Sequence, residues 1–122
     1  MKVSRRGVLA GAAALPLATQ ARGWRWDHHG ETVLLFDPAL PAAQAFADAG
    51  REAGRAVVAL EGDRIRLAQD LFASRPLLVR GVSRQGDAVL VAEVAQEAGY
   101  TCVAQRVDGV AIDWTLAPRT RG

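Results

Sequence analysis

Hydrophobic positions along this 122-residue chain form short continuous runs that alternate with stretches of helical spacing. The continuous runs predict buried strands at 32–36, 56–60 and 77–82. After each run, apolar residues recur every three or four positions, which predicts an amphipathic helix. The repeated order of strand, loop and helix is typical of an α/β domain built on a mainly parallel sheet.

Each predicted helix has an apolar face and a recognisable end. The first begins at Pro41 and ends before Gly54, because glycine readily adopts the left-handed conformation that follows a helix. The second begins after Asp63, a favourable N-cap, and runs to Ser74, while Gly99 ends the third. The residues expected to face the core are Ala42, Ala45, Phe46, Ala49 and Ala53 in the first helix, Ile65, Ala68, Leu71 and Phe72 in the second, and Leu90, Val91, Val94, Ala95 and Ala98 in the third.

The sequence after Gly99 predicts a β-hairpin. Apolar and polar residues alternate from Val110 to Leu116, and Asp108 with Gly109 is a strong hairpin-turn signal. Because crossovers between parallel strands are right-handed, we predict an α/β fold of three layers with parallel strands ordered 2-1-3-4 and an antiparallel fifth strand beside the fourth. One helix should cover one face of the sheet and two helices the other.

That strand order resembles the flavodoxin-like arrangement in outline. The phosphate-binding loop of that family is missing after the first strand, where the sequence reads Asp37-Pro38-Ala39. The resemblance therefore implies the arrangement of strands alone and no flavin.

Residues 1–21 have the features of a signal peptide. A basic start precedes an apolar, alanine-rich stretch, and small residues at Thr19 and Ala21 suit signal-peptidase cleavage after Ala21. A general secretory signal and an uncleaved membrane anchor are the alternatives, although the apolar stretch is short for a membrane span and we expect no stable anchor.

The residues from Ser4 to Leu9, SRRGVL, resemble the twin-arginine motif of bacterial export signals. Val8 stands where that motif more commonly has Phe. The resemblance implies that Arg5 and Arg6 direct the chain to the twin-arginine translocation machinery, and that the folded protein reaches the periplasm or the medium.

The predicted cleavage changes the charge of the remaining chain. Of its 15 basic residues, Lys2, Arg5 and Arg6 precede the cleavage position, which leaves 12 against 13 acidic residues. A nearly neutral domain argues against binding nucleic acid. The predicted boundaries are a signal peptide at 1–21, an N-terminal arm at 22–30, one α/β domain at 31–117 and a C-terminal tail at 118–122.

Polar residues follow the first and third strands, whose carboxyl ends should meet where the strand order reverses. Asp37 follows the first strand, and Ser83, Arg84 and Asp87 follow the third. A crevice at such a switch point, beside the amino end of a helix, suits a small polar ligand. The alternative is structural: Ser83 or Asp87 caps the helix, and Arg84 pairs with Asp37 at the surface.

Elsewhere the sequence offers few candidates for chemistry. Trp24 and Trp26 precede His28 and His29 in the predicted arm, but adjacent histidines on an extended segment point in opposite directions and no third ligand is placed beside them. The single cysteine, Cys102, lies in an apolar run and is expected to be a buried, inert thiol. We therefore predict no metal site and no cofactor.

Three classes of function fit these observations. The first is an exported, non-enzymatic binding or accessory module that acts through the switch-point crevice or an exposed sheet face, with a protein partner or as a homo-oligomer. The second is a small hydrolase with Ser83 as nucleophile, Asp37 as orienting carboxylate and His28 or His29 as base, although no GxSxG motif surrounds Ser83. The third is a metal or redox accessory protein, for which the chain lacks a clustered ligand set. We favour the first.

Overall fold

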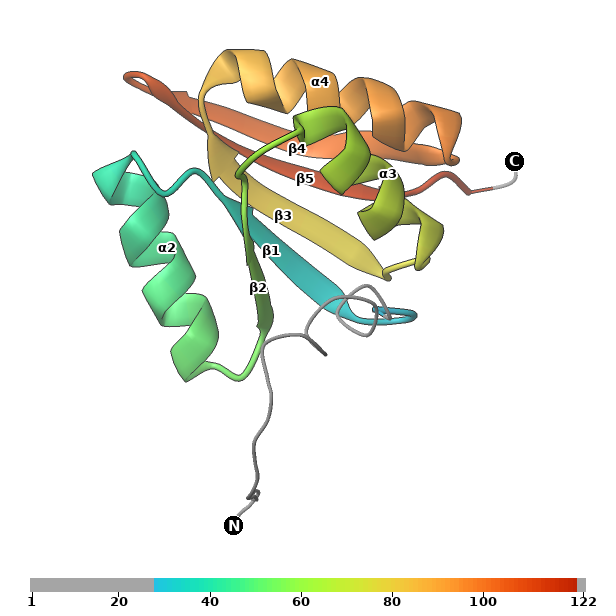
Figure 1. The fold of residues 1–122 in the computed structure, drawn as a ribbon, viewed down its shortest axis with the longest axis horizontal. Coiled ribbons are helices and arrows are strands. Elements are labelled where there is room, and N and C mark those ends of the chain that lie inside the picture. The colour runs from blue at the N-terminus through green and yellow to red at the C-terminus, as the bar shows by residue number, and fades with distance from the viewer. Residues whose placement is uncertain (1–27, 121–122) are drawn as a thin grey trace, which may run out of the picture.

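Five strands form one mixed sheet in the computed structural model, which describes residues 28–120 (Figure 1). The elements in chain order are β1 (Thr32–Phe36), α2 (Pro41–Glu52), β2 (Ala56–Ala59), α3 (Arg64–Ala73), β3 (Leu78–Ser83), α4 (Gln85–Glu97), β4 (Tyr100–Asp108) and β5 (Ala111–Pro118). The predicted α/β class is confirmed. The predictions of a signal peptide and of the two tryptophans in the arm lie outside the described residues.

The strand order is β2-β1-β3-β5-β4, so the predicted order 2-1-3-4-5 is wrong for its last two strands. The predicted β4–β5 hairpin forms, with its turn at Gly109 and Val110 rather than at Asp108 and Gly109, but β5 lies between β3 and β4 and is antiparallel to both. The inner position needs a strand that can be buried, and Ile112, Trp114 and Leu116 of β5 are almost fully buried. In β4, by contrast, every residue after Tyr100 is exposed. The sheet thus departs from the flavodoxin-like outline at these strands.

The Trp114 side chain explains why β5 is the neighbour of β3. Trp114 stands opposite Gly81 of β3 in the antiparallel register, and a Cβ atom added to Gly81 would overlap the indole ring. The indole N–H donates to Ser83 Oγ over 3.0 Å. Strand β3 therefore supplies both the space and the hydrogen-bond acceptor that this large side chain requires.

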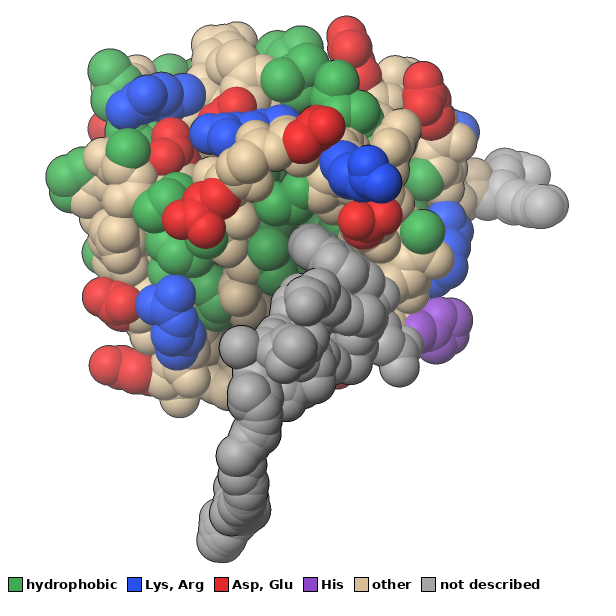
Figure 2. All heavy atoms as spheres, in the orientation of Figure 1, with side chains coloured by type: hydrophobic (Ala, Val, Ile, Leu, Met, Phe, Trp, Pro, Cys, Tyr) green, Lys and Arg blue, Asp and Glu red, His purple; other side chains and the backbone are tan. Residues whose placement is uncertain are grey.

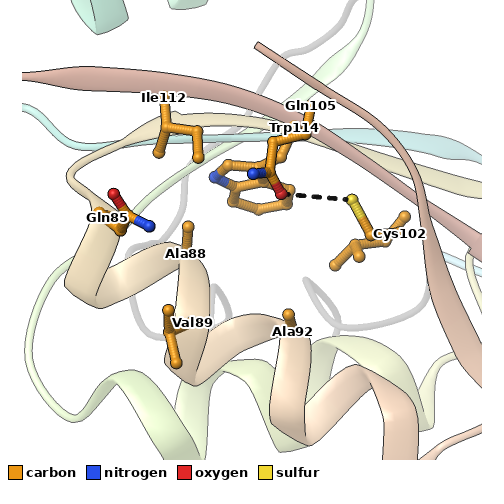
Figure 3. A pocket seen from close by; sticks show the side chains of 9 residues that line it. Gln85, Ala88, Val89, Ala92, Cys102, Gln105, Ile112 and Trp114 are labelled. Atoms are coloured by element: carbon orange, nitrogen blue, oxygen red, sulfur yellow. Dashed lines mark hydrogen bonds between the residues drawn. The ribbon is translucent and has the colours of Figure 1, made fainter. Parts of the chain in front are cut away.

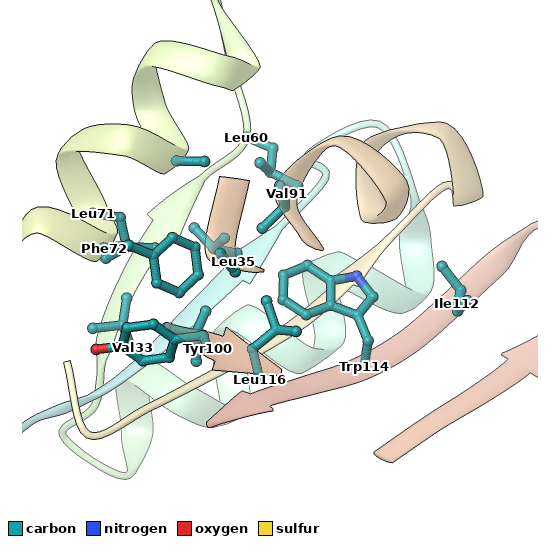
Figure 4. Close-up of a cluster of buried hydrophobic side chains, with 13 residues drawn as sticks. Val33, Leu35, Leu60, Leu71, Phe72, Val91, Tyr100, Ile112, Trp114 and Leu116 are labelled. Atoms are coloured by element: carbon teal, nitrogen blue, oxygen red, sulfur yellow. The ribbon is translucent and has the colours of Figure 1, made fainter. Parts of the chain in front are cut away.

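Helices cover the two faces of the sheet unequally, as predicted. Helix α2 packs on β1, β2 and β3, whereas α3 and α4 lie side by side on the other face (Figure 1). The larger core lies under α3 and α4 and includes Trp114, Phe72 and Tyr100 (Figure 4). The smaller core lies under α2 and includes Phe36, Leu40 and Val82.

Helix α2 buries a different stripe from the predicted one. Its buried residues are Ala43, Ala47 and Gly50, whereas Ala42, Ala45, Ala49 and Ala53 are exposed and Phe46 is half-buried. Gly50 decides this orientation, because the space that its Cβ atom would fill is occupied by the side chain of Leu34 in β1. Only a residue without a side chain lets the helix approach the sheet so closely.

The predicted ends of the helices are confirmed, whereas the predicted buried faces are partly wrong. Asp63 caps α3 by accepting hydrogen bonds from the backbone N–H of Ile65 and of the following residue. Gly54 and Gly99 have φ angles of 77° and 91°, as expected after a helix. The side chains of Ile65 and Leu90, however, are exposed, so their predicted core positions are wrong.

A buried tyrosine joins the ends of α3 and α4. The hydroxyl of Tyr100 donates to the carbonyl oxygen of Pro76 over 2.6 Å, and the Arg75 guanidinium lies 5.0 Å from the centre of its ring. Burial raises the pKa of Tyr100, and the positive charge of Arg75 opposes this shift. Arg75 itself has a φ of 57° and donates to the carbonyl oxygen of Ala98, at the end of α4.

The fit between Gly81 and Trp114 gives a test of the strand order. We expect Gly81→Ala to lower the free energy of unfolding by about 1–3 kcal/mol, because the added methyl group overlaps the indole ring. Chemical denaturation followed by circular dichroism measures the change. Gly86→Ala is the control, since no atom lies near its Cβ position and alanine is the better helix former, by at most about 1 kcal/mol. Equal stability of the two variants would contradict the pairing of β3 with β5.

Candidate functional site

The carboxyl ends of β1 and β3 meet at the point where the strand order reverses. Strands β1 and β3 are neighbours, and the helices that follow them, α2 and α4, lie on opposite faces of the sheet (Figure 1). The loop after β1 is attached to β3 by a hydrogen bond from the Asp37 N–H to the carbonyl oxygen of Val82, 3.0 Å long. The predicted switch point is therefore present.

Asp37 and Arg84 lie together at this edge. One Asp37 oxygen accepts a hydrogen bond from the backbone N–H of Ala39 over 2.9 Å, and the other lies 3.7 Å from Arg84 Nε. The Asp37 side chain is 6% exposed, but that of Arg84 is 59% exposed. Water therefore screens the pair, which contributes about 0–1 kcal/mol to stability. The contact matches the structural alternative for these two residues.

Ser83 points away from the loop and into the core. Its side chain is fully buried; its hydroxyl accepts from the Trp114 indole N–H and donates to the carbonyl oxygen of Arg84 over 2.9 Å. His28 precedes β1 and so lies at the opposite end of that strand from Asp37, where its Nδ1 is 3.1 Å from Glu31 Oε1. A buried serine separated from both histidines by the length of a strand does not form the nucleophile and base of a hydrolase.

Asp87 belongs to a second ion pair that the sequence analysis missed. It lies in the first turn of α4, where a carboxylate interacts favourably with the helix dipole, and its Oδ1 is 3.3 Å from Arg64 Nε. Arg64 also donates to the carbonyl oxygen of Gly62 over 2.8 Å. The pair links the starts of α3 and α4. The four predicted site residues thus divide between two ion pairs and the core.

A second candidate surface lies where α2 leaves the sheet uncovered. Arg80 of β3 lies 3.5 Å from Asp113 of β5, and its guanidinium is 5.4 Å from the centre of the Phe46 ring. Two hollows of about 300 and 340 Å³ flank Phe46. The α2 residues that the sequence predicted to face the core line these hollows instead. Ala49 and Ala53 line the first hollow, and Ala42 and Ala45 line the second.

A third candidate is a small cavity between α4 and the β4–β5 hairpin (Figure 3). It measures about 90 Å³ and lies beside Trp114, with Val89 and Ala92 of α4 on its other side. Cys102 also lines it, 3.8 Å from Gln105 Oε1, and is exposed, so its prediction as a buried thiol is wrong. The register places Cys102 on the outermost strand, which explains its exposure. The cavity has room for a small apolar group but not for a typical organic ligand.

Charges of both signs are interspersed over the face shown in Figure 2, with hydrophobic patches between them. Among residues 28–120, no cluster of three or more His, Cys, Asp or Glu side chains has the arrangement of a metal site. Within the same residues, no helix has the length and apolar character needed to cross a membrane.

Comparison with known proteins adds no family. No model of a known protein family matches the chain, and no curated protein matches its sequence. The function must be inferred from the geometry described above.

The position of Ser83 gives a test that separates a structural from a catalytic role. We expect Ser83→Ala to lower the free energy of unfolding by about 1–3 kcal/mol, because the buried Trp114 N–H loses its acceptor. Chemical denaturation measures the loss. Ser74→Ala is the matched control, since it removes a hydroxyl that only donates to the carbonyl of Leu71 and should cost about 0.5–1.5 kcal/mol. Unchanged stability combined with lost turnover of a simple ester would instead identify Ser83 as a nucleophile.

Proposed function

We propose that this protein is an exported, non-enzymatic binding or accessory module that engages a protein partner through an open face of its sheet. The open face is the α2-side surface of β5 and β4, the neighbouring Arg80 side chain of β3, the exposed stripe of α2 that contains Ala42, Ala45, Phe46 and Ala49, and the two hollows beside Phe46. The observation that carries the proposal is the unequal helix cover: α2 packs mainly on β1, β2 and β3, while β5 meets the core under α2 through Ala111 at one end.

The chemistry of the open face suits a polypeptide. On one side it offers small alanines and the Phe46 ring, which can contact apolar side chains. On the other side Arg80 and Asp113 are each 43% exposed and can exchange their mutual ion pair for polar groups of a partner. An apolar centre bordered by polar groups is the usual composition of a protein interface.

The switch-point edge supports binding less well than the open face does. Asp37 and Asp87 already have basic partners in Arg84 and Arg64, and Ser83 is committed to Trp114. A small polar ligand there would have to displace these contacts. At the open face, the alanines that line the two hollows beside Phe46 have apolar side chains with no polar contacts to displace.

Export is the second part of the proposal. The twin-arginine resemblance at Arg5 and Arg6 supports transport of the folded protein, cleavage near Ala21 and release into the periplasm or the medium.

The export route is tested by changing the arginine pair. We expect the double variant Arg5→Lys and Arg6→Lys to accumulate as uncleaved precursor in the cytoplasm, because the twin-arginine machinery requires the pair. Cell fractionation and mass spectrometry of the N-terminus measure the outcome. Arg22→Lys, just after the proposed cleavage position, should be exported and cleaved normally. Normal export of the double variant would show that a general secretory signal operates.

The open face is tested by placing a large charge on α2. We expect Ala49→Arg to reduce capture of cross-linked partners from the exported fraction by about tenfold or more, because a buried interface charge costs over ~1.4 kcal/mol. Quantitative mass spectrometry compares it with the unmodified protein. Ala73→Arg, an exposed position on α3 of the opposite face, is the matched control and should capture partners normally. Undiminished capture by Ala49→Arg would contradict the proposal.

A further inference from the structure

Strand β4 is an outer strand with an unusually accessible free side. It is nine residues long, and among the described residues its only strand partner is β5. Every residue after Tyr100 is exposed. The outer side of such a strand presents a row of backbone donors and acceptors that can pair with another strand.

The features that usually protect an outer strand are weak here. Strand β4 contains no proline and no lysine. Its one irregularity is a bulge between Cys102 and Ala104, so the last four residues, from Gln105 to Asp108, continue in regular register with β5. That regular half is the part of the edge best suited to pairing.

Side chains on the regular half are arranged with charges on one face and an apolar residue on the other. Val107 lies opposite Ile112, on the face that α4 covers, and is 63% exposed. Arg106 and Asp108 flank it and point to the opposite face. Within residues 28–120 neither charge forms an ion pair: Asp113, which stands opposite Arg106, is paired with Arg80, and Asp108 stands opposite Ala111.

We propose that β4 pairs in antiparallel orientation with β4 of a second copy of this chain, across a two-fold axis through Val107. In this register Arg106 of each copy stands opposite Asp108 of the other, and the two Val107 side chains meet. The same strand therefore supplies both the positive and the negative charge of each pair, as a self-complementary two-fold interface requires. The charges thus identify the occupant of the edge as a second copy.

The charges also select the register. A shift of the axis by two residues, to Gln105, places Arg106 opposite Ala104 and leaves Asp108 without an opposite charge. Only the axis through Val107 brings both opposite-charge pairs directly across the new strand boundary, where cross-strand pairs interact most strongly.

The proposed pairing produces one continuous sheet across both copies. Because the axis is perpendicular to the sheet, both α4 helices lie on the face that carries the two Val107 side chains. The open faces of the two copies join on the other face. Asp108 also lines the second hollow of the open face, but the dimer is measured with the purified protein alone, so either proposal can fail without the other.

Charge reversal tests both the partner and the register. Sedimentation velocity over a range of concentrations, with the protein purified in the form that its host makes, should show a reversible monomer–dimer equilibrium that weakens with added salt. We expect Arg106→Asp and Asp108→Arg each to raise the dissociation constant about tenfold or more, because each places like charges opposite one another. Arg66→Asp, on the exposed side of α3, is the matched control and should leave the equilibrium unchanged.

Recombination of the charges distinguishes the proposal from a simple loss of folding. An equimolar mixture of Arg106→Asp and Asp108→Arg should form a heterodimer, since each altered residue then faces an opposite charge. The double variant Arg106→Asp/Asp108→Arg should dimerise with itself. An unmodified protein that stays monomeric at every concentration, single variants that dimerise as tightly as the unmodified protein, or a mixture that stays monomeric would each overturn the proposal.

Discussion

The contact between Trp114 and strand β3 is the constraint on which the rest of the structure depends. The indole ring occupies the space that Gly81 leaves empty, and its N–H donates to the buried hydroxyl of Ser83. Both the space and the acceptor come from alternate residues of β3, so the ring obtains them when β5 lies directly beside β3. The contact places β5 inside the sheet and β4 at its edge (Figure 1).

The functional surfaces follow from that placement. With β5 inside, the sheet extends beyond α2, which packs mainly on β1, β2 and β3 and meets β5 at Ala111. The α2 side of β5 and β4 is then free for a partner, and β4 has an unpaired outer side. Both proposals, for the open face and for the β4 edge, therefore depend on the packing of Trp114 against Gly81 and Ser83 in the core.

The polar residues at the switch point illustrate how a site predicted from sequence can serve the fold instead. Asp37 holds its own loop through the Ala39 N–H and meets Arg84, while Asp87 meets Arg64 and links two helices. Each carboxylate already has an arginine partner, so a ligand would gain little by binding to it. Asp37 and Arg84 lie at the same edge, as predicted, whereas nothing in the local sequence indicated that Arg64 would pair with Asp87.

Local sequence determined the elements and their ends, because the signals for these act over a few residues. The strand at 32–36, the Asp63 cap and the left-handed residues Gly54 and Gly99 are all of this kind. The helix faces were ambiguous, since α2 carries two alanine-rich stripes, and only the close approach of Gly50 to Leu34 selects the buried one. The strand order, the exposure of Cys102 and the inward direction of Ser83 were decided by tertiary structure alone. Each depends on the fit of Trp114 beside Gly81, two residues more than thirty positions apart in the chain. The local hydrophobic pattern is compatible with β4 or with β5 beside β3, so it does not determine the strand order.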